Sequence, residues 1–387
     1  MEMWKNCILA DLGEVVGGAT PSTKVKENYD GGTIPWITPK DLAGFQGRFI
    51  SRGERNITEQ GLRSCSTQIM PKDTVLFSSR APIGYVAIAK TELCTNQGFK
   101  SIVPNANTDP LFLYYLLVYN KDRIENMGVG TTFKEVSATT MRGIPVRVPT
   151  SVSHQKHIAN TLSMLDERIE CNLAINKNLE EQARAIFDSF YLKSKNKVPF
   201  TQMIKILGGG TPKTTERAFW CGQIPFFTPK DVGNPYVLQT EKYVTELGLT
   251  NCNSRLYPVN TTFVTARGTV GKVSLAGIPM SMNQSCYALM SDALHPFMTY
   301  FYTLHTVKAL QHKATGAVFD AIVTSDFESE LLHRIPENDA SQLLSRISPM
   351  MENIRVNTVG NLRLTELRDA LLPRLMSGEI DVSDIAL

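Results

Sequence analysis

Apolar residues recur every three or four positions along residues 158–190, and this spacing predicts one long helix with a hydrophobic seam. Two asparagines occupy seam positions in its middle. The seam consists of Ile158, Leu162, Leu165, Ile169, Asn172, Asn176, Leu179, Ala183, Ile186 and Phe190. The sequence therefore predicts a coiled-coil helix within 151–197, with buried asparagines that fix its register.

The same pattern returns 185 residues later and predicts a second helix over 337–382. Nine of the ten seam positions keep their character, and Arg368 is the departure. The second seam is Leu343, Ile347, Met350, Ile354, Asn357, Asn361, Leu364, Arg368, Leu371 and Leu375. The alternative is a pair of amphipathic helices packed on a globular core, which the strict 3.5-residue period and the recurring polar pair disfavour.

The segments before these helices also repeat each other. Motifs recur in the same order at offsets of 186–191 residues, which indicates a tandem duplication with small insertions. The matches are Gly18-Ala19-Thr20-Pro21 with Gly209-Gly210-Thr211-Pro212, Ile34–Leu42 with Ile224–Val232, Arg80–Val86 with Arg267–Val273, Asn96-Gln97 with Asn283-Gln284, and Gly130–Phe133 with Gly316–Phe319.

The predicted fold class is α+β, with two mixed α/β heads and two long antiparallel helices in a pseudo-twofold tandem repeat. The heads are placed at 1–150 and 198–336, and the helices at 151–197 and 337–387 including the tail. Capping residues begin each helix, while Pro199 and Ser377-Gly378 end them. The heads are expected to contain strands at 74–78, 85–89, 261–265 and 272–275, and helices at 110–126 and 296–313.

Connectivity gives the helix directions. Because a compact head usually has its entry and exit close together, the second helix must run back along the first, and the end of the chain should lie near its beginning. The 33 seam residues of one helix correspond to about 48 Å of helix. That length exceeds one turn of duplex DNA, about 34 Å.

Composition excludes several classes of protein. The chain has 387 residues, 42% of them apolar and 20% charged, and no apolar run of transmembrane length, so a soluble, cytoplasmic protein without a membrane partner is expected. Its seven cysteines form no C-x-x-C pair and are expected to be reduced, mostly core residues. The net charge of +3 does not by itself indicate a nucleic-acid partner.

Signatures of catalysis are absent from the sequence. Gly268–Lys272 only resembles a phosphate-binding loop, and Asn234-Pro235-Tyr236 lacks one proline of the adenine methyltransferase motif. His154 and His157 are the only histidines with ligand spacing and are expected to be solvated. The sequence therefore predicts no catalytic residue and no metal site in this chain.

The turns of the heads instead carry residue types that bind phosphates and base edges. The candidate DNA-binding residues are Thr20, Ser22, Lys24, Thr38, Lys40, Arg80 and Lys134 in the first head, and Thr211, Lys213, Thr214, Thr228, Lys230 and Arg267 in the second. An alternative remains open: Thr-Pro-Lys-Asp is simply a turn with an N-cap, and Arg80 and Arg267 pair with a carboxylate inside the head. Residues that discriminate between sequences should lie where the heads differ, at 43–64 and 233–254.

This ordered set of motifs, present twice and covering essentially the whole chain, resembles the specificity subunit of type I restriction-modification systems. The resemblance implies two target recognition domains that each read half of an asymmetric bipartite site in double-stranded DNA, and spacer helices that set the gap. It also implies two methyltransferase subunits, which methylate adenine with S-adenosylmethionine, and two restriction subunits, which use ATP and magnesium. None of these cofactors is expected in this chain.

Two other classes of function stay open. One is a coiled-coil adaptor whose duplicated heads bind proteins, and DNA binding that remains sequence-independent would favour it. The other is an enzyme with an unrecognised site, which methyl transfer or cleavage by the purified chain would reveal.

Overall fold

The computed structural model describes residues 4–45, 47–80, 82–130, 134–233, 235–313 and 321–382. It divides into two compact units, one formed by residues 1–170 with 363–387 and the other by residues 171–362. Each unit contains one head and a part of both long helices. The predicted motif match at 130–133 and 316–319 lies outside the described residues except for Gly130.

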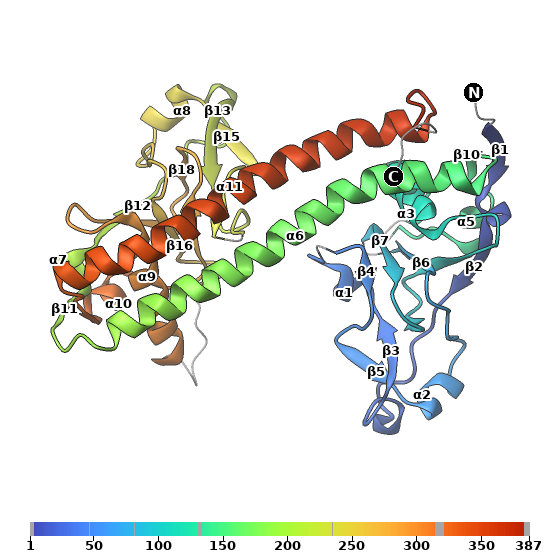
Figure 1. The fold of residues 1–387 in the computed structure, drawn as a ribbon, viewed down its shortest axis with the longest axis horizontal. Coiled ribbons are helices and arrows are strands. Elements are labelled where there is room, and N and C mark those ends of the chain that lie inside the picture. The colour runs from blue at the N-terminus through green and yellow to red at the C-terminus, as the bar shows by residue number, and fades with distance from the viewer. Residues whose placement is uncertain are drawn as a thin grey trace. The chain divides into compact units, whose positions relative to one another are not determined.

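The first head consists of two small sheets, a two-stranded ribbon and short helices (Figure 1). The larger sheet has the order β2 (Gly13–Gly17), β9 (Lys100–Pro104), β6 (Val75–Ser79), β7 (Ile83–Ala89) and β4 (Phe49–Ile50), and its last pair is parallel. The smaller sheet has the order β5 (Arg55–Ile57), β3 (Ile34–Ile37) and β8 (Cys94–Thr95), and β1 (Trp4–Ile8) pairs with β10 (Pro145–Pro149). The helices are η1 (Leu9–Asp11), η2 (Lys26–Asn28), α1 (Pro39–Leu42), α2 (Glu59–Arg63), α3 (Pro110–Tyr119), α4 (Lys121–Asn126) and α5 (Ala138–Arg142).

The second head repeats this topology strand for strand. Its larger sheet has the order β12 (Lys205–Gly208), β19 (Cys286–Met290), β16 (Thr262–Thr265), β17 (Val273–Ala276) and β14 (Tyr236–Val237), again with a parallel last pair. The smaller sheet has the order β15 (Lys242–Val244), β13 (Trp220–Phe227) and β18 (Ser281–Met282), and β11 (Lys197–Pro199) pairs with β20 (Leu331–His333). The helices are α7 (Phe200–Met203), η3 (Arg217–Phe219), α8 (Glu246–Thr250), α9 (Pro296–Lys313) and α10 (Thr324–Glu328). The predicted duplication and the α+β class are confirmed.

The predicted strands are all present within two residues of their expected ends, but the single helix predicted at 110–126 is wrong. The segment forms two helices, because α3 ends where the side chain of Asn120 donates to the carbonyl of Leu116 at 2.8 Å. Its start follows the sequence closely: Pro110 takes the first helical position, and the Asp109 carboxylate accepts the backbone N–H of Phe112 at 2.9 Å.

The long helices are α6 (Val152–Tyr191) and α11 (Glu337–Met376), with 40 residues each. The prediction that Pro199 ends the first helix is wrong, since α6 ends at Tyr191 and Pro199 belongs to β11. The predicted end of the second helix is confirmed, because Gly378 adopts a φ of +77°, the left-handed conformation that favours glycine after a helix.

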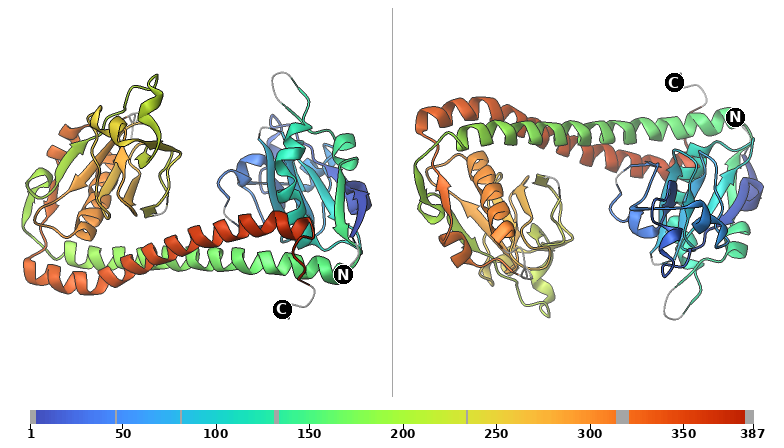
Figure 2. Two further views of the ribbon diagram at one scale, coloured as in Figure 1. Left: turned by 90° about the horizontal axis from the view of Figure 1, so that it is seen from above. Right: turned by 90° about the horizontal axis from the view of Figure 1, so that it is seen from below.

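Within each unit the two helices lie side by side and also pack on the head (Figure 2). In the first unit, Ile158, Leu162 and Leu375 share one core with α3 and the larger sheet. In the second, Ala183 and Leu343 share a core with α9 and its sheet. The helices therefore combine both sequence-based alternatives: they pair with each other and they cover a globular core.

The seam asparagines form two cross-helix pairs inside the second unit. Asn172 donates from Nδ2 to Oδ1 of Asn361 at 2.7 Å, and Asn357 donates from Nδ2 to Oδ1 of Asn176 at 2.8 Å. Because a later residue of α6 meets an earlier residue of α11, the helices are antiparallel here, as predicted. Oδ1 of Asn172 and Nδ2 of Asn361 are buried and have no hydrogen-bond partner among the described residues.

Replacing one complete pair should therefore stabilise the helices. The double variant Asn172→Leu with Asn361→Leu is expected to raise the free energy of unfolding by roughly 1–3 kcal/mol, because it removes two buried, unsatisfied polar atoms. Asn172→Leu alone should lower it, because the amide of Asn361 then loses its partner. Urea unfolding monitored by circular dichroism measures both, and a double variant less stable than the single one would contradict the pairing.

Residues near the first and last described positions lie together in the first unit. The ring of Trp4 lies 2.8 Å from the place that a Cβ on Gly378 would occupy, and the Arg147 guanidinium donates to the carbonyl of Ser377 at 3.1 Å. The ribbon β1–β10 also has its counterpart in β11–β20.

A circular permutant with the natural termini joined by a short linker and the chain opened between Leu192 and Asn196, before β11, is expected to fold. Its thermal midpoint should lie within a few degrees of the wild-type value, because the opening breaks no strand pair. A matched permutant opened inside β6 should unfold or aggregate, and equal behaviour of the two would contradict the arrangement.

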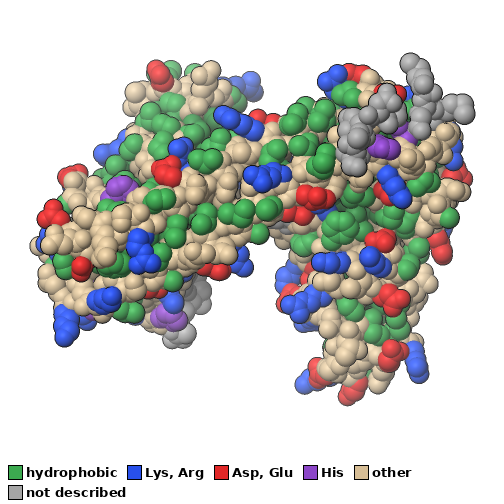
Figure 3. Space-filling view, viewed as in Figure 1, with side chains coloured by type: hydrophobic (Ala, Val, Ile, Leu, Met, Phe, Trp, Pro, Cys, Tyr) green, Lys and Arg blue, Asp and Glu red, His purple; other side chains and the backbone are tan. Residues whose placement is uncertain are grey.

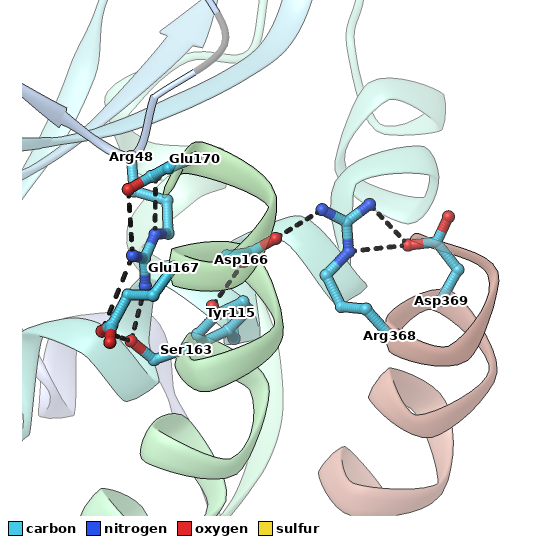
Figure 4. A network of polar contacts seen from close by, with 8 residues as sticks. All are labelled: Arg48, Tyr115, Ser163, Asp166, Glu167, Glu170, Arg368 and Asp369. Carbon is cyan, nitrogen blue, oxygen red and sulfur yellow. Dashed lines mark hydrogen bonds and ion pairs between the residues drawn. The ribbon is translucent and has the colours of Figure 1, made fainter. Parts of the chain in front are cut away.

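A polar network joins the first head to both helices of its unit (Figure 4). The buried guanidinium of Arg48 donates to Ser163 at 2.6 Å and to Glu170 at 3.1 Å, both on α6. One turn away, Asp166 accepts from the hydroxyl of Tyr115 at 2.5 Å and from Arg368 of α11 at 2.7 Å. Burial, followed by the charge of Asp166, raises the pKa of Tyr115 well above its ordinary value, so its hydroxyl stays a donor. This network explains why Arg368 departs from the apolar seam.

Two expectations about single residue types are wrong. Only Cys94 and Cys286 are buried, where burial raises their pKa to about 11 and about 12, whereas Cys171 and Cys221 are exposed. All seven cysteines are free, as expected. His154 is buried rather than solvated, because the first strand brings the ring of Trp4 over the first turn of α6, with ring centroids 6.1 Å apart.

Candidate nucleic-acid interface

Four recurring turns meet at one place in each head. In the first head, the N–H of Ala19 donates to Thr95 at 3.1 Å, and the N–H of Asn96 donates to Ile37 at 2.9 Å. Ser79, next to Arg80, donates its N–H to Gly98 at 2.7 Å. Motifs that lie up to 80 residues apart in sequence thus form a single surface, which we call the motif cluster.

The second head builds the same cluster with its own copies. The N–H of Gly210 donates to Met282 at 3.2 Å, that of Asn283 to Phe227 at 3.0 Å, and that of Ala266 to Ser285 at 2.8 Å. The backbone segments approach each other so closely at the first turn that it requires glycine. A Cβ on Gly18 or Gly209 would lie 2.1 Å from a backbone oxygen. Glycine at this turn therefore serves the packing of the cluster in both heads.

An exposed threonine–glutamine pair lies in each cluster. The hydroxyl of Thr20 donates to Oε1 of Gln97, and that of Thr211 donates to Oε1 of Gln284. A glutamine amide oxygen has two lone pairs, so Gln97 and Gln284 keep one free lone pair and two N–H donors, and glutamine reads adenine by donating to N7 and accepting from N6. Sequence reasoning selected the threonines but missed the glutamines, although the repeated Asn-Gln dipeptide signalled them.

The Thr-Pro-Lys-Asp turns fit the alternative of a capped turn, and the turn of the first head begins helix α1 whereas that of the second begins no helix. Asp41 accepts the hydroxyl and the N–H of Thr38, both at 2.7 Å, and Asp231 holds Thr228 in the same way. The hydroxyls of these threonines are therefore already engaged inside each head. The lysines of the turns remain exposed, each beside one carboxylate: Lys40 pairs with Glu54 at 2.8 Å and Lys230 with Glu241 at 3.5 Å. The hydrogen bond that Lys40 donates to Glu54 raises the pKa of Lys40.

The remaining candidates of the first turns lie on exposed loops. Ser22 and Lys24 precede η2, and Lys213 and Thr214 precede η3. A cation lies over an aromatic ring beside each loop: Arg55 over Tyr29 at 5.9 Å, and Lys242 over Trp220 at 5.7 Å. Sequence reasoning did not select Arg55 or Lys242, yet both lie in the segments where the heads were expected to differ.

Trp220 and Lys242 also line a cavity of about 500 Å³, together with Thr214, Cys221, Gly222, Glu241 and Tyr243. Stacking surfaces next to cations are features with which proteins contact bases and backbone. This concave surface belongs to the second head.

Arg80, Arg267 and Lys134 lie at the edge of the clusters. Arg80 pairs with Glu135 at 3.8 Å, which matches the carboxylate alternative, whereas Arg267 is exposed and forms no ion pair among the described residues. Lys134 is exposed beside Gly128.

Positively and negatively charged side chains are mixed on the surface and are not clustered by sign. On the described part of the face shown in Figure 3, lysine and arginine side chains are interspersed with aspartate and glutamate. Among the described residues, no three histidine, cysteine or acidic side chains are grouped so that they could hold a metal ion. Within the residues that the structure describes, no helix is long and apolar enough to cross a bilayer.

Known proteins share this organisation. A family model described as the type I restriction modification DNA specificity domain matches residues 1–181 and 193–339. The type I restriction enzyme MjaIX specificity subunit of Methanocaldococcus jannaschii is 32% identical over 99% of this chain and 94% of its own length. The HindI specificity subunit of Haemophilus influenzae is 22% identical over 98% of this chain and 100% of its own length. A crystal structure of a type I restriction-modification S subunit from M. genitalium covers 97% of this chain and 96% of its own, with a TM-score of 0.58 and 15% identity.

Proposed function

The chain belongs to the type I restriction-modification DNA specificity family, and we propose that each of its heads reads one half of an asymmetric, bipartite site in double-stranded DNA. Reading sequence is the role of this family, and its specificity subunits are not catalytic. The recognition domains are proposed at 1–150 and 198–336, and the spacer helices at 151–197 and 337–387.

One observation carries the proposal: the same motif cluster recurs in two heads whose neighbouring side chains differ. Shared parts such as the Thr20–Gln97 and Thr211–Gln284 pairs suit contacts common to both half-sites. The segments that differ place Arg55 beside Tyr29 in one head and Lys242 beside Trp220 in the other. Two heads that share a backbone framework but present different side chains are what a DNA site with two different half-sites requires.

The partners are part of the proposal. We infer that two methyltransferase subunits and two restriction subunits assemble on this chain, and that they bring S-adenosylmethionine, ATP and magnesium. Methylation requires that an adenine leave the base stack, so the heads hold the flanking sequence while a partner takes the base. With a net charge of +3, the isolated chain should bind DNA weakly and with strong salt dependence.

Base-resolved adenine methylation of host DNA, with and without the gene for this chain, tests the proposal. Loss of one bipartite motif on deletion is expected, and the motif reveals both half-sites and the gap. A methylome that stays unchanged while the methyltransferase partner is present and active would contradict the proposal. It would favour the adaptor with protein-binding heads.

A further inference from the structure

The recurring arginines, Arg80 and Arg267, have the same backbone pairing in the two heads, but different side chains lie next to them. Arg80 forms a backbone bridge with Glu135, and Arg267 forms the same bridge with Ala321. One residue further on, Val136 donates its N–H to Ser79 at 2.9 Å, and Ile322 donates its N–H to Ala266 at 2.9 Å. Ala321 therefore takes the place of Glu135 in the second head.

In the first head this place holds a carboxylate shared by two cations. Glu135 lies 3.8 Å from the guanidinium of Arg80 and 3.3 Å from Nζ of Lys100. In the second head Tyr287 replaces Lys100, because Tyr287 pairs with Gly208 of β12 as Lys100 pairs with Gly17 of β2. The charge cluster of the first head is thus absent from the described residues of the second.

Arg267 nevertheless stays at the motif cluster. Its N–H donates to Ser285, the residue after Gln284, at 3.3 Å, and the hydroxyl of Thr269 donates to the carbonyl of Pro229 at 3.1 Å. The side chain of Arg267 is exposed. Unlike Arg80, Arg267 forms no ion pair among the described residues, and its backbone adjoins the residue that follows the exposed Gln284.

We propose that Arg267 reads a guanine edge in the half-site of the second head, whereas Glu135 withholds Arg80 from this role in the first. A free guanidinium donates two parallel hydrogen bonds to O6 and N7 of guanine. A carboxylate at its side competes for the same donors and is itself repelled by the acceptor edge and by phosphates. The proposal rests on the proposed DNA-reading function.

The test uses the full-length chain co-expressed with its methyltransferase subunit, with base-resolved methylation of the host genome as the readout. Arg267→Ala and Ala321→Glu should each relax the methylated motif at the same single position, in one half-site only, with the preference for guanine falling about tenfold or more. Arg267→Lys should relax this position too, because lysine keeps the charge but not the bidentate geometry. Arg346→Ala, an exposed arginine on α11, is the matched control and should leave the motif unchanged.

The outcomes distinguish a failure of base reading by Arg267 from a failure of the proposed function. If no variant changes the motif, or if methylation falls uniformly at every site as for a phosphate contact, base reading by Arg267 is overturned while the proposed function stands. If the wild-type chain itself directs no motif, both fail. Glu135→Ala should add a guanine preference to the other half-site, and weaker discrimination there would overturn the withholding role of Glu135. Thermal unfolding of each variant confirms that it is folded.

Discussion

Deleting one heptad from each long helix is expected to shorten the gap of the recognised DNA site. The matched segments are 171–177 of α6 and 356–362 of α11, which face each other through the two asparagine pairs. Seven residues correspond to about 10 Å of helix, which equals the rise of about three base pairs. Because seven residues make nearly two full turns, both seams keep their phase across the junction. The gap should therefore become shorter by up to about three base pairs, while both half-sites stay the same.

Duplicating the same two heptads supplies the matched control, since the duplication retains both asparagine pairs. It should lengthen the gap, in the opposite direction to the deletion. Base-resolved methylation measures both variants together with the wild-type chain. If deletion and duplication leave the gap at its original length, the helices do not set it.

The repeated parts of this fold could be predicted because their signals are local and occur twice. The seam from Ile158 to Phe190 is a periodic pattern, and its second copy excluded chance. The motif turns were found in the same way, and the structure brings them together in each head. By contrast, the end of α6 was placed at Pro199 because the chain between Tyr191 and Lys197 shows no strong breaker. The pairing of β11 with β20, a contact between residues about 130 positions apart, decides the boundary there.

The sequence predicted the types of residue in the candidate site, but it did not predict which side chains they pair with. Sequence reasoning left open whether Arg80 and Arg267 pair with carboxylates, and the structure answers differently for each. The answer depends on the residue that bridges each arginine, which is glutamate at position 135 in the first head and alanine at position 321 in the second. The network around Arg48 was not predicted at all, since Arg48, Tyr115 and Arg368 share no motif and meet only through tertiary packing.

Arg368→Ala alone is expected to lower the free energy of unfolding of the first unit by about 3 kcal/mol, the cost of leaving one member of a buried ion pair without its partner. Asp166 is 7% exposed, and without Arg368 its charge is left with the Tyr115 hydroxyl as its remaining partner in the network. Removing one member of a buried ion pair costs more than the pair contributes, because the other charge stays desolvated. Urea unfolding followed by near-ultraviolet circular dichroism measures the loss.

The second unit indicates which further substitutions should restore the stability lost in Arg368→Ala. The residues equivalent to Tyr115, Asp166 and Arg368 by the repeat are Phe301, Met351 and Ala183, which are buried in one apolar cluster. The triple variant Tyr115→Phe, Asp166→Met, Arg368→Ala should therefore recover stability to within about 1 kcal/mol of the wild type, since buried ion pairs can be replaced by apolar groups of similar volume. In the reverse direction, Ala183→Arg alone should destabilise the second unit strongly, and Met351→Asp with Phe301→Tyr should recover part of the loss. A triple variant as unstable as Arg368→Ala would show that the first head depends on the charges themselves, and not only on a filled, satisfied interface with its helices.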